Sequence, residues 1–278
     1  MNPAAPVIPP APSNPVAPLF EVRGLCKRYL GLTAVDDLSY RVEAGAIVGL
    51  IGPNGSGKST SIDCVTGFQR PDAGDWLLDG RSLARLAPHR IAQAGLVRTF
   101  QNVRAYDEMS LLDNLRIAGQ EQDGIGWLRA LAGGERLKRA QERTDERAAG
   151  LLSLIGLADY AQAPAAALSY GQRKLLAIAA TMMTRPKLVV LDEPVAGVNP
   201  TMIRHIEQAI RRLNAEGVAL IIIEHNVEFV MNLCSRVLVL ESGRKIAEGA
   251  PSLVRSDPLV LAAYLGKSRG GRQAAAHG

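Results

Sequence analysis

The stretch GPNGSGKST combines residue types that can hold a polyphosphate; it follows the apolar run AIVGLI and precedes the helix-like segment STSIDCVTGF. Glycines let backbone amides converge on phosphate oxygens, a lysine can reach the β- and γ-phosphates, and a serine hydroxyl can coordinate Mg²⁺. A Gly-rich turn would match this pattern by chance on the order of once per hundred chains of this size. The predicted nucleotide-binding residues are Gly52, Pro53, Asn54, Gly55, Ser56, Gly57, Lys58, Ser59 and Thr60, with Lys58 also catalytic and Ser59 a metal ligand.

Two adjacent acids could supply hydrolytic chemistry. In LVVLDEP, four apolar residues are followed by Asp192 and Glu193, which places both carboxylates at the carboxyl end of a buried strand. Open α/β sheets bind their ligands at that edge. Two acids after a strand are commonly just a polar loop, but beside a phosphate loop we expect Asp192 to hold Mg²⁺ and Glu193 to orient or deprotonate the attacking water.

Two further polar residues complete the predicted catalytic set with Glu193 and Lys58. His225 follows the apolar run VALIII and one glutamate, and it could hydrogen-bond a γ-phosphate, although a lone histidine after a strand is usually structural. Gln101, in VRTFQNV, carries an amide that could contact Mg²⁺ or the water, so it is also a predicted metal ligand.

The elements that must position these residues follow an α/β pattern. Short apolar runs alternate with helical stretches, which predicts a largely parallel sheet with strands at 46–51, 187–191, 218–223 and 236–240. Partial alternation at 20–25 and 34–42 predicts an antiparallel edge sheet beside the nucleotide site. Between about 104 and 168, helical spacing predicts a helical subdomain, its apolar positions being Leu137, Ala140, Ala148, Leu151, Leu152 and Ile155.

Composition excludes several other classes of protein. The chain has 278 residues, 47% of them hydrophobic, which is enough for one large domain or for one domain with a helical insertion. Its three cysteines form no CxxC pair, so neither a disulfide framework nor a zinc site is indicated. The net charge of +5 comes with interleaved acids and gives little support to nucleic-acid binding. We expect residues 1–18 to be a disordered Pro/Ala-rich extension, 19–266 the nucleotide-binding domain and 267–278 a flexible tail.

The order of motifs resembles the nucleotide-binding subunits of ABC transporters. Between the phosphate loop and LVVLDEP stands LSYGQ, residues 168–172, followed by RKLLAIAATMM. The resemblance covers about residues 19–266 and implies a P-loop NTPase core of the ABC ATPase type that hydrolyses ATP with Mg²⁺. It implies that Tyr29, in CKRYLG, stacks on adenine, that Gln101 belongs to the glutamine loop and that His225 is the switch histidine. It also implies that the signature residues contact the ATP of an opposite subunit, namely Ser169, Gly171 and Gln172.

Two positions depart from the commonest family pattern. Tyr170 replaces the first glycine of the signature, and Asn199, in AGVNP, stands where an aspartate often contacts the opposite subunit. Asparagine keeps hydrogen-bonding capacity but carries no charge. These features, with VRTFQNVRAYDEMSLLDNL and the closing AYLG, look like the ATPase subunits of high-affinity branched-chain amino-acid importers. Similar subunits serve urea or short-chain amide uptake, and that alternative stays open.

The resemblance also implies partners and a location. We expect two membrane-spanning permease subunits, a second ABC ATPase subunit of the same or a different chain, and indirectly a solute-binding protein, with no nucleic acid. The chain would sit peripherally on the cytoplasmic face of the inner membrane, with the loop at 101–106 near a permease. The rival class is an ABC ATPase that acts on DNA or ribosomes without transport; those proteins usually carry a long coiled coil or two fused cassettes, for which 278 residues leave no room.

Overall fold

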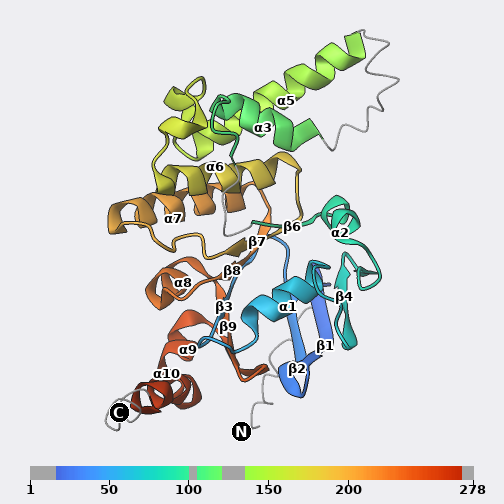
Figure 1. The fold of residues 1–278 in the computed structure, drawn as a ribbon, viewed down its shortest axis with the longest axis vertical. Helices are drawn as coiled ribbons and strands as arrows, with labels where there is room; N and C mark the ends of the chain where they lie inside the picture. The colour runs from blue at the N-terminus through green and yellow to red at the C-terminus, as the bar shows by residue number, and fades with distance from the viewer. Residues whose placement is uncertain (1–16, 100–104, 121–134, 271–278) are drawn as a thin grey trace, which may run out of the picture.

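The computed structural model describes residues 17–99, 105–120 and 135–270, and its centre is a six-stranded sheet (Figure 1). The strand order is β10-β9-β3-β8-β7-β6, and every neighbouring pair is parallel except β10 with β9. The α/β class with a mostly parallel sheet is therefore confirmed. The strands span Ile47–Ile51 (β3), Leu96–Arg98 (β6), Leu188–Asp192 (β7), Ala219–Ile223 (β8), Arg236–Glu241 (β9) and Arg244–Gly249 (β10).

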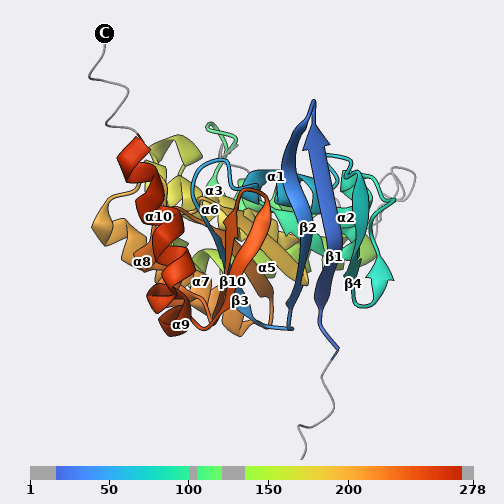
Figure 2. The ribbon, with the colours of Figure 1, turned by 90° about the horizontal axis from the view of Figure 1, so that it is seen from below.

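A second, antiparallel sheet has the order β2-β1-β4-β5, and Figure 2 shows it beside helix α1, Lys58–Val65. The two strands expected near the N-terminus are present and longer than predicted, as Phe20–Tyr29 (β1) and Leu32–Val42 (β2). Register shifts interrupt their pairing, which explains why their alternation is only partial in the sequence. The strands Ala73–Leu78 (β4) and Arg81–Ser82 (β5) were not predicted.

The parallel strands separate two apolar cores. Along β3, Ile47 and Ile51 belong to one core and Val48 and Leu50 to the other. Burial on both faces is why the central strands are continuous apolar runs rather than alternating ones. One core packs against five helices, Tyr170–Met183 (α6), Pro200–Ala215 (α7), Val227–Leu233 (α8), Pro251–Ser256 (α9) and Pro258–Gly270 (α10). The other packs against α1, the antiparallel sheet and Pro88–Ala94 (α2).

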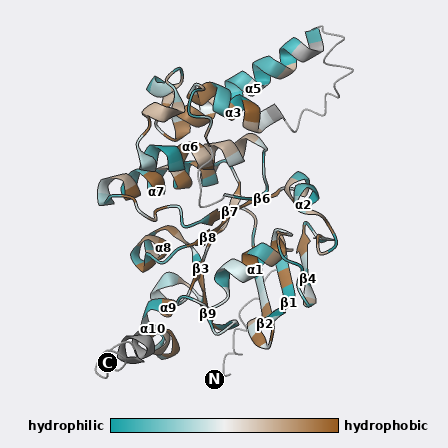
Figure 3. Cartoon of the chain, in the orientation of Figure 1, coloured by the Kyte–Doolittle hydropathy of each residue, from teal (hydrophilic) through white to brown (hydrophobic). Residues whose placement is uncertain are grey.

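A group of helices extends the first core beyond the sheet (Figure 1). It contains Leu111–Gln120 (α3), Glu135–Leu154 (α5) and the short 3-10 turns Ala158–Tyr160 (η1) and Ala165–Ala167 (η2), all in the segment predicted to be helical. Figure 3 shows that α5 is mostly hydrophilic. Its few apolar positions are buried as their spacing predicts, namely Ala140, Ala148, Leu151 and Leu152, with Ile155 just beyond the helix; the side chain of Leu137 lies outside the description.

The ends of the chain fall largely outside the described residues. Helix α10 continues through residues 267–270, into the segment predicted as a tail, and the predicted domain bounds remain predictions. Among the described residues, none of the helices is long and apolar enough to cross a membrane.

Candidate active site

The phosphate loop lies between the end of β3 and the start of α1. Gly57, directly before α1, has a φ of 98°, and a Cβ there would lie 2.3 Å from the carbonyl oxygen of Ala34, so the backbone demands glycine. Lys58 opens the helix and is only 5% exposed. Its ammonium donates hydrogen bonds to the carbonyl oxygens of Gly52 at 2.8 Å and Pro53 at 3.1 Å. The loop is thus wrapped around a cation at a helix N-terminus, an arrangement suited to an anion.

The other predicted residues of the loop differ in exposure. Asn54, Gly55 and Ser59 are exposed, Thr60 is half-buried, and Ser56 is 1% exposed, with its carbonyl accepting from the amide of Gly243 at 3.0 Å. The buried Ser56 anchors the loop to the turn between β9 and β10. The exposed Ser59 lies in the first turn of α1, where the positive end of the helix dipole favours an anion.

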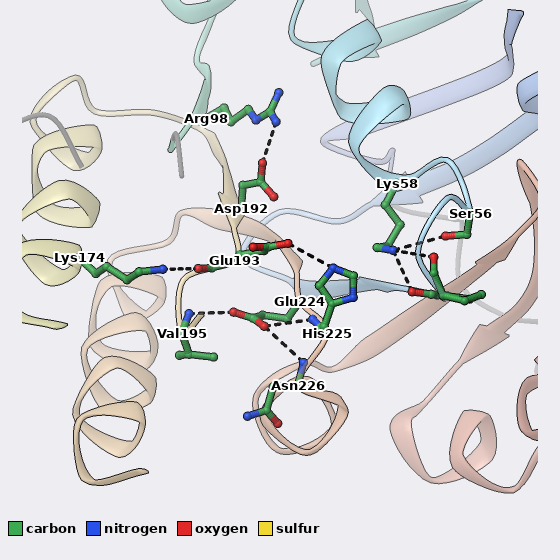
Figure 4. A network of polar contacts seen from close by, with 12 residues as sticks. Ser56, Lys58, Arg98, Lys174, Asp192, Glu193, Val195, Glu224, His225 and Asn226 are labelled. Carbon is green, nitrogen blue, oxygen red and sulfur yellow. Dashed lines mark hydrogen bonds and ion pairs between the residues drawn. The ribbon is translucent and has the colours of Figure 1, made fainter. Parts of the chain in front are cut away.

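The two acids and the histidine meet at the carboxyl ends of neighbouring strands (Figure 4). Asp192 is the last residue of β7 and is 8% exposed. Glu193 follows it, and His225 comes two residues after β8; the Nε2 atom of His225 lies 3.2 Å from Oε1 of Glu193. Since β3 is the other neighbour of β8, Lys58 is at the same edge. Four residues from distant parts of the sequence are therefore brought together, as expected for parallel strands.

Glu193 has an unusual backbone conformation. Its φ is 49°, in the left-handed region that a non-glycine residue occupies at a cost of about 1–3 kcal/mol. The amide of Glu193 donates to the carbonyl of Ile223 at 2.9 Å, and its own carbonyl accepts from Nζ of Lys174 at 2.6 Å. The surrounding structure holds this residue in a conformation that it would not adopt unaided.

Arg98 is a site residue that sequence reasoning missed. At the end of β6, it donates from Nη2 to Oδ2 of Asp192 at 2.7 Å and from Nη1 to Asp63 on α1. Burial disfavours its charge, but the hydrogen bonds to the two carboxylates outweigh burial and raise the pKa of Arg98. The ion pairs fix the carboxylate of Asp192 against the helix that follows the phosphate loop. The available signal was a basic residue ending a short strand, three positions before the predicted Gln101.

The oxygen donors suit Mg²⁺. Ser59 supplies a hydroxyl and Asp192 a carboxylate, the hard ligands that this ion takes while keeping several waters and substrate oxygens. In the part of the chain that the structure describes, no group of three or more His, Cys, Asp or Glu residues could hold a metal ion. One hydroxyl and one carboxylate fit an ion that also binds substrate phosphate oxygens. Gln101, the third predicted ligand, lies outside the described residues.

The signature residues form the start of α6. Ser169 is the N-cap: its hydroxyl accepts from the amide of Gln172 at 3.4 Å, and the Gln172 side chain accepts from the amide of Ser169 at 2.9 Å. Gly171 is buried, and a Cβ there would lie 2.4 Å from Cγ of Met202 on α7. Within the described residues, the side chains of Ser169 and Gln172 make no hydrogen bond to the phosphate loop. The structure does not bring these two motifs together inside one chain.

Tyr29 lies at the end of β1, 40% exposed, with the ammonium of Lys27 5.1 Å from its ring centroid. An exposed aromatic face is compatible with stacking on a base. Asn199, the other departure in the sequence, caps α7 by accepting from the amide of Met202 at 2.9 Å.

Comparison with known proteins places these observations in a family. Residues 35–196 match the family model of ABC transporters. Residues 244–269 match the family model of the branched-chain amino acid ATP-binding cassette transporter. The high-affinity branched-chain amino acid transport ATP-binding protein BraF of Pseudomonas aeruginosa is 39% identical over 252 residues, covering 90% of this chain and 99% of BraF. The high-affinity branched-chain amino acid transport ATP-binding protein LivG of Salmonella typhimurium is 40% identical over 252 residues, which cover 90% of this chain and 99% of LivG.

A solved structure agrees with this comparison. The ADP conformation of MJ1267, an ATP-binding cassette of an ABC transporter, superposes with a TM-score of 0.77 at 33% identity. The match covers 90% of this chain and 100% of that one.

Proposed function

The chain belongs to the ABC transporter family and is an ATPase of that family, and from this premise we propose that it energises a membrane importer of branched-chain or other hydrophobic amino acids. The observation that carries the substrate class is the extent of the similarity. It spans 99% of BraF and LivG, and it includes a separate match at residues 244–269 to the branched-chain amino acid cassette.

Each residue at the strand ends has a role in the proposed hydrolysis. Lys58 and the amides of the phosphate loop would hold the β- and γ-phosphates of ATP, and Ser59 and Asp192 would hold Mg²⁺, which would neutralise charge on the phosphates. Glu193 orients the attacking water and accepts its proton. His225, 3.2 Å from Glu193, donates toward the γ-phosphate and keeps the carboxylate aligned. Gln101 is assigned the glutamine-loop role beside Mg²⁺.

Two chains complete the proposed site. The side chains of Ser169 and Gln172 cap α6, and the signature is assigned to the nucleotide of a second ATPase subunit, as the family resemblance implies. Tyr29 is assigned to adenine. The start of α6 offers a hydroxyl and the positive end of a helix to that nucleotide.

Membrane subunits provide the remaining partners. The names of the relatives, transport ATP-binding proteins, support membrane permease partners and a position at the membrane. The rest of the proposed assembly is two permease subunits, a solute-binding protein and a peripheral position on the cytoplasmic face of the inner membrane. Residues 101–106, which lie between β6 and α3 in the sequence, are proposed to contact a permease, with Arg104 as the residue to reverse in charge.

Mass spectrometry of the complex tests this proposal. The tagged chain is extracted from its own membranes in mild detergent. Two different polytopic proteins with a second, shorter ATPase are expected, and membrane vesicles holding that complex should take up labelled leucine in preference to urea. Uptake of urea instead would reassign the solute. Recovery of ribosomal or DNA-repair proteins with no membrane protein would overturn the transport assignment.

A further inference from the structure

A buried carboxylate next to His225 has no part in the hydrolysis described above. Glu224 is 3% exposed. Its Oε1 accepts from the amide of Val195 at 2.8 Å, and its Oε2 accepts from the amides of His225 at 3.0 Å and Asn226 at 3.3 Å (Figure 4). Because it is buried and both of its oxygens accept from backbone amides, this carboxylate is not placed to act as the base.

The three amides belong to two different loops. Val195 lies two residues after Glu193 in the loop that follows β7, whereas His225 and Asn226 lie in the loop that follows β8. The single side chain of Glu224 therefore joins the backbone beside Glu193 to the backbone of its histidine partner. Hydrogen bonds from backbone amides to a carboxylate are charge-assisted and about twice as strong as neutral ones.

The loop after β7 needs such support. Glu193 sits at a φ of 49°, and strained conformations of this kind persist only where neighbouring groups over-determine them. On one side, Lys174 of α6, itself 6% exposed, donates to the carbonyl of Glu193 at 2.6 Å. On the other side, Glu224 holds the amide of Val195. The strained residue is thus fixed between a buried cation and a buried anion.

Burial raises the pKa of Glu224, and the hydrogen bonds from Val195, Asn226 and His225 work in the opposite direction. Only an ionised carboxylate can accept at both positions, because it has two acceptor oxygens. A glutamine of the same shape would present an NH₂ group to at least one of the amide donors, since its amide has a single acceptor oxygen. The site therefore distinguishes glutamate from glutamine at almost constant volume.

We propose that Glu224 is a positioning residue for hydrolysis, which sets the geometry of the Glu193–His225 pair by tying their two loops together. This inference rests on the proposed ATPase roles of Glu193 and His225. It predicts that Glu224→Gln lowers kcat on the order of tenfold. Losses of about this size follow when a residue that orients a metal-binding side chain by a hydrogen bond is mutated. The KM for ATP should change less than threefold, because the amides that Glu224 accepts from belong to the loops after β7 and β8 and not to the phosphate loop.

Steady-state ATP hydrolysis by the full chain tests this, at a protein concentration where turnover per chain no longer rises. Glu228→Gln is the matched control: Glu228 is an exposed glutamate on α8, four residues further along, and its variant should keep wild-type kcat. Thermal melting of each variant reports on folding. A kcat for Glu224→Gln within twofold of wild type would overturn the proposal.

A double-mutant cycle separates positioning from general destabilisation. If Glu224 acts through the histidine, Glu224→Gln should cost much less in a His225→Ala background than in the wild type. Equal, additive losses would contradict the proposal. If Glu224→Gln yields no folded protein, Glu224→Asp keeps the charge on a side chain one methylene shorter, and wild-type kcat in that variant counts against the proposal.

Glu193→Gln distinguishes failure of the inference from failure of the proposed function. Loss of turnover in Glu193→Gln with normal turnover in Glu224→Gln removes only the role of Glu224. Normal turnover in Glu193→Gln removes the catalytic assignment itself, and the positioning role with it.

Discussion

At the scale of single residues, Lys58 is held by the same loop that would bind phosphate. Its ammonium bonds two backbone carbonyls of residues 52–53, so nucleotide binding must replace these contacts with phosphate oxygens. A charged hydrogen bond contributes about 1.5–3 kcal/mol. The contribution of Lys58 to ATP affinity is therefore the free-energy difference between its hydrogen bonds to phosphate oxygens and those to the backbone carbonyls. The phosphate oxygens carry the larger negative charge.

Lys58→Ala is expected to weaken ATP binding by roughly tenfold to a hundredfold, because each 1.4 kcal/mol is about a factor of ten in affinity. Isothermal titration with ATP measures the change. Lys187→Ala is the control, since Lys187 is an exposed lysine paired with Asp79 on the surface and its removal should leave the affinity unchanged. ATP binding by Lys58→Ala with wild-type affinity would argue against the assigned role.

At the scale of elements, the residue that caps helix α6 is also the one proposed to contact the nucleotide bound by a second subunit. Ser169 is both the cap of the helix and the signature hydroxyl. Ser169→Ala removes both and should lower the free energy of unfolding by about 1 kcal/mol. Ser169→Asn keeps a good cap, as Asn199 does for α7, but loses the hydroxyl.

The two variants should therefore agree in turnover and differ in stability. We expect both to hydrolyse ATP slowly, and urea unfolding should show only Ser169→Ala to be destabilised. Wild-type turnover in Ser169→Asn would mean that the serine serves the helix alone.

Two glycines test how tightly the elements are packed. At Gly49 on β3, a Cβ would lie 2.4 Å from Cγ1 of Val230 on α8, so Gly49→Ala should lower the free energy of unfolding by about 1–3 kcal/mol. At Gly150 on α5, a Cβ would meet nothing within 4 Å. Gly150→Ala should therefore raise the free energy of unfolding by about 0.5–1 kcal/mol. Urea denaturation measures the free energy of unfolding of both variants. Equal changes in the two would show that β3 and α8 can move apart to accept the added methyl group.

The predictability of these elements followed from their burial. The four central strands were predicted to within a residue or so at each end because they are apolar on both faces. The short strand β6 and the antiparallel β4 and β5 carry no comparable run. Asp192, Glu193 and Lys58 were identifiable because local motifs surround them. Arg98 and Glu224 were not identifiable. Arg98 is 94 residues from its partner Asp192, and Glu224 is 29 residues from its partner Val195, so only the folded sheet makes them neighbours.

At the scale of the whole molecule, the proposed sites need two chains. ATP turnover per chain should therefore rise with protein concentration, as mass action requires for a dimer. Phosphate release measured across a dilution series checks this. A specific activity independent of concentration would contradict a site shared between chains.

Mixing two impaired variants sharpens the same test. In a mixed dimer of Lys58→Ala and Ser169→Ala, one composite site carries both defects and the other carries none. Turnover should therefore rise on mixing, whereas sites that are each complete within one chain would stay as slow as in the separate variants.

The alternation of side chains along β3 also has a consequence for how the molecule comes apart. Because Val48 and Leu50 belong to one core and Ile47 and Ile51 to the other, neither core can lose its strand without exposing the second. Melting is therefore expected to be a single cooperative transition, with equal calorimetric and van't Hoff enthalpies. Two resolved heat-absorption peaks would mean that one core survives the loss of its neighbour.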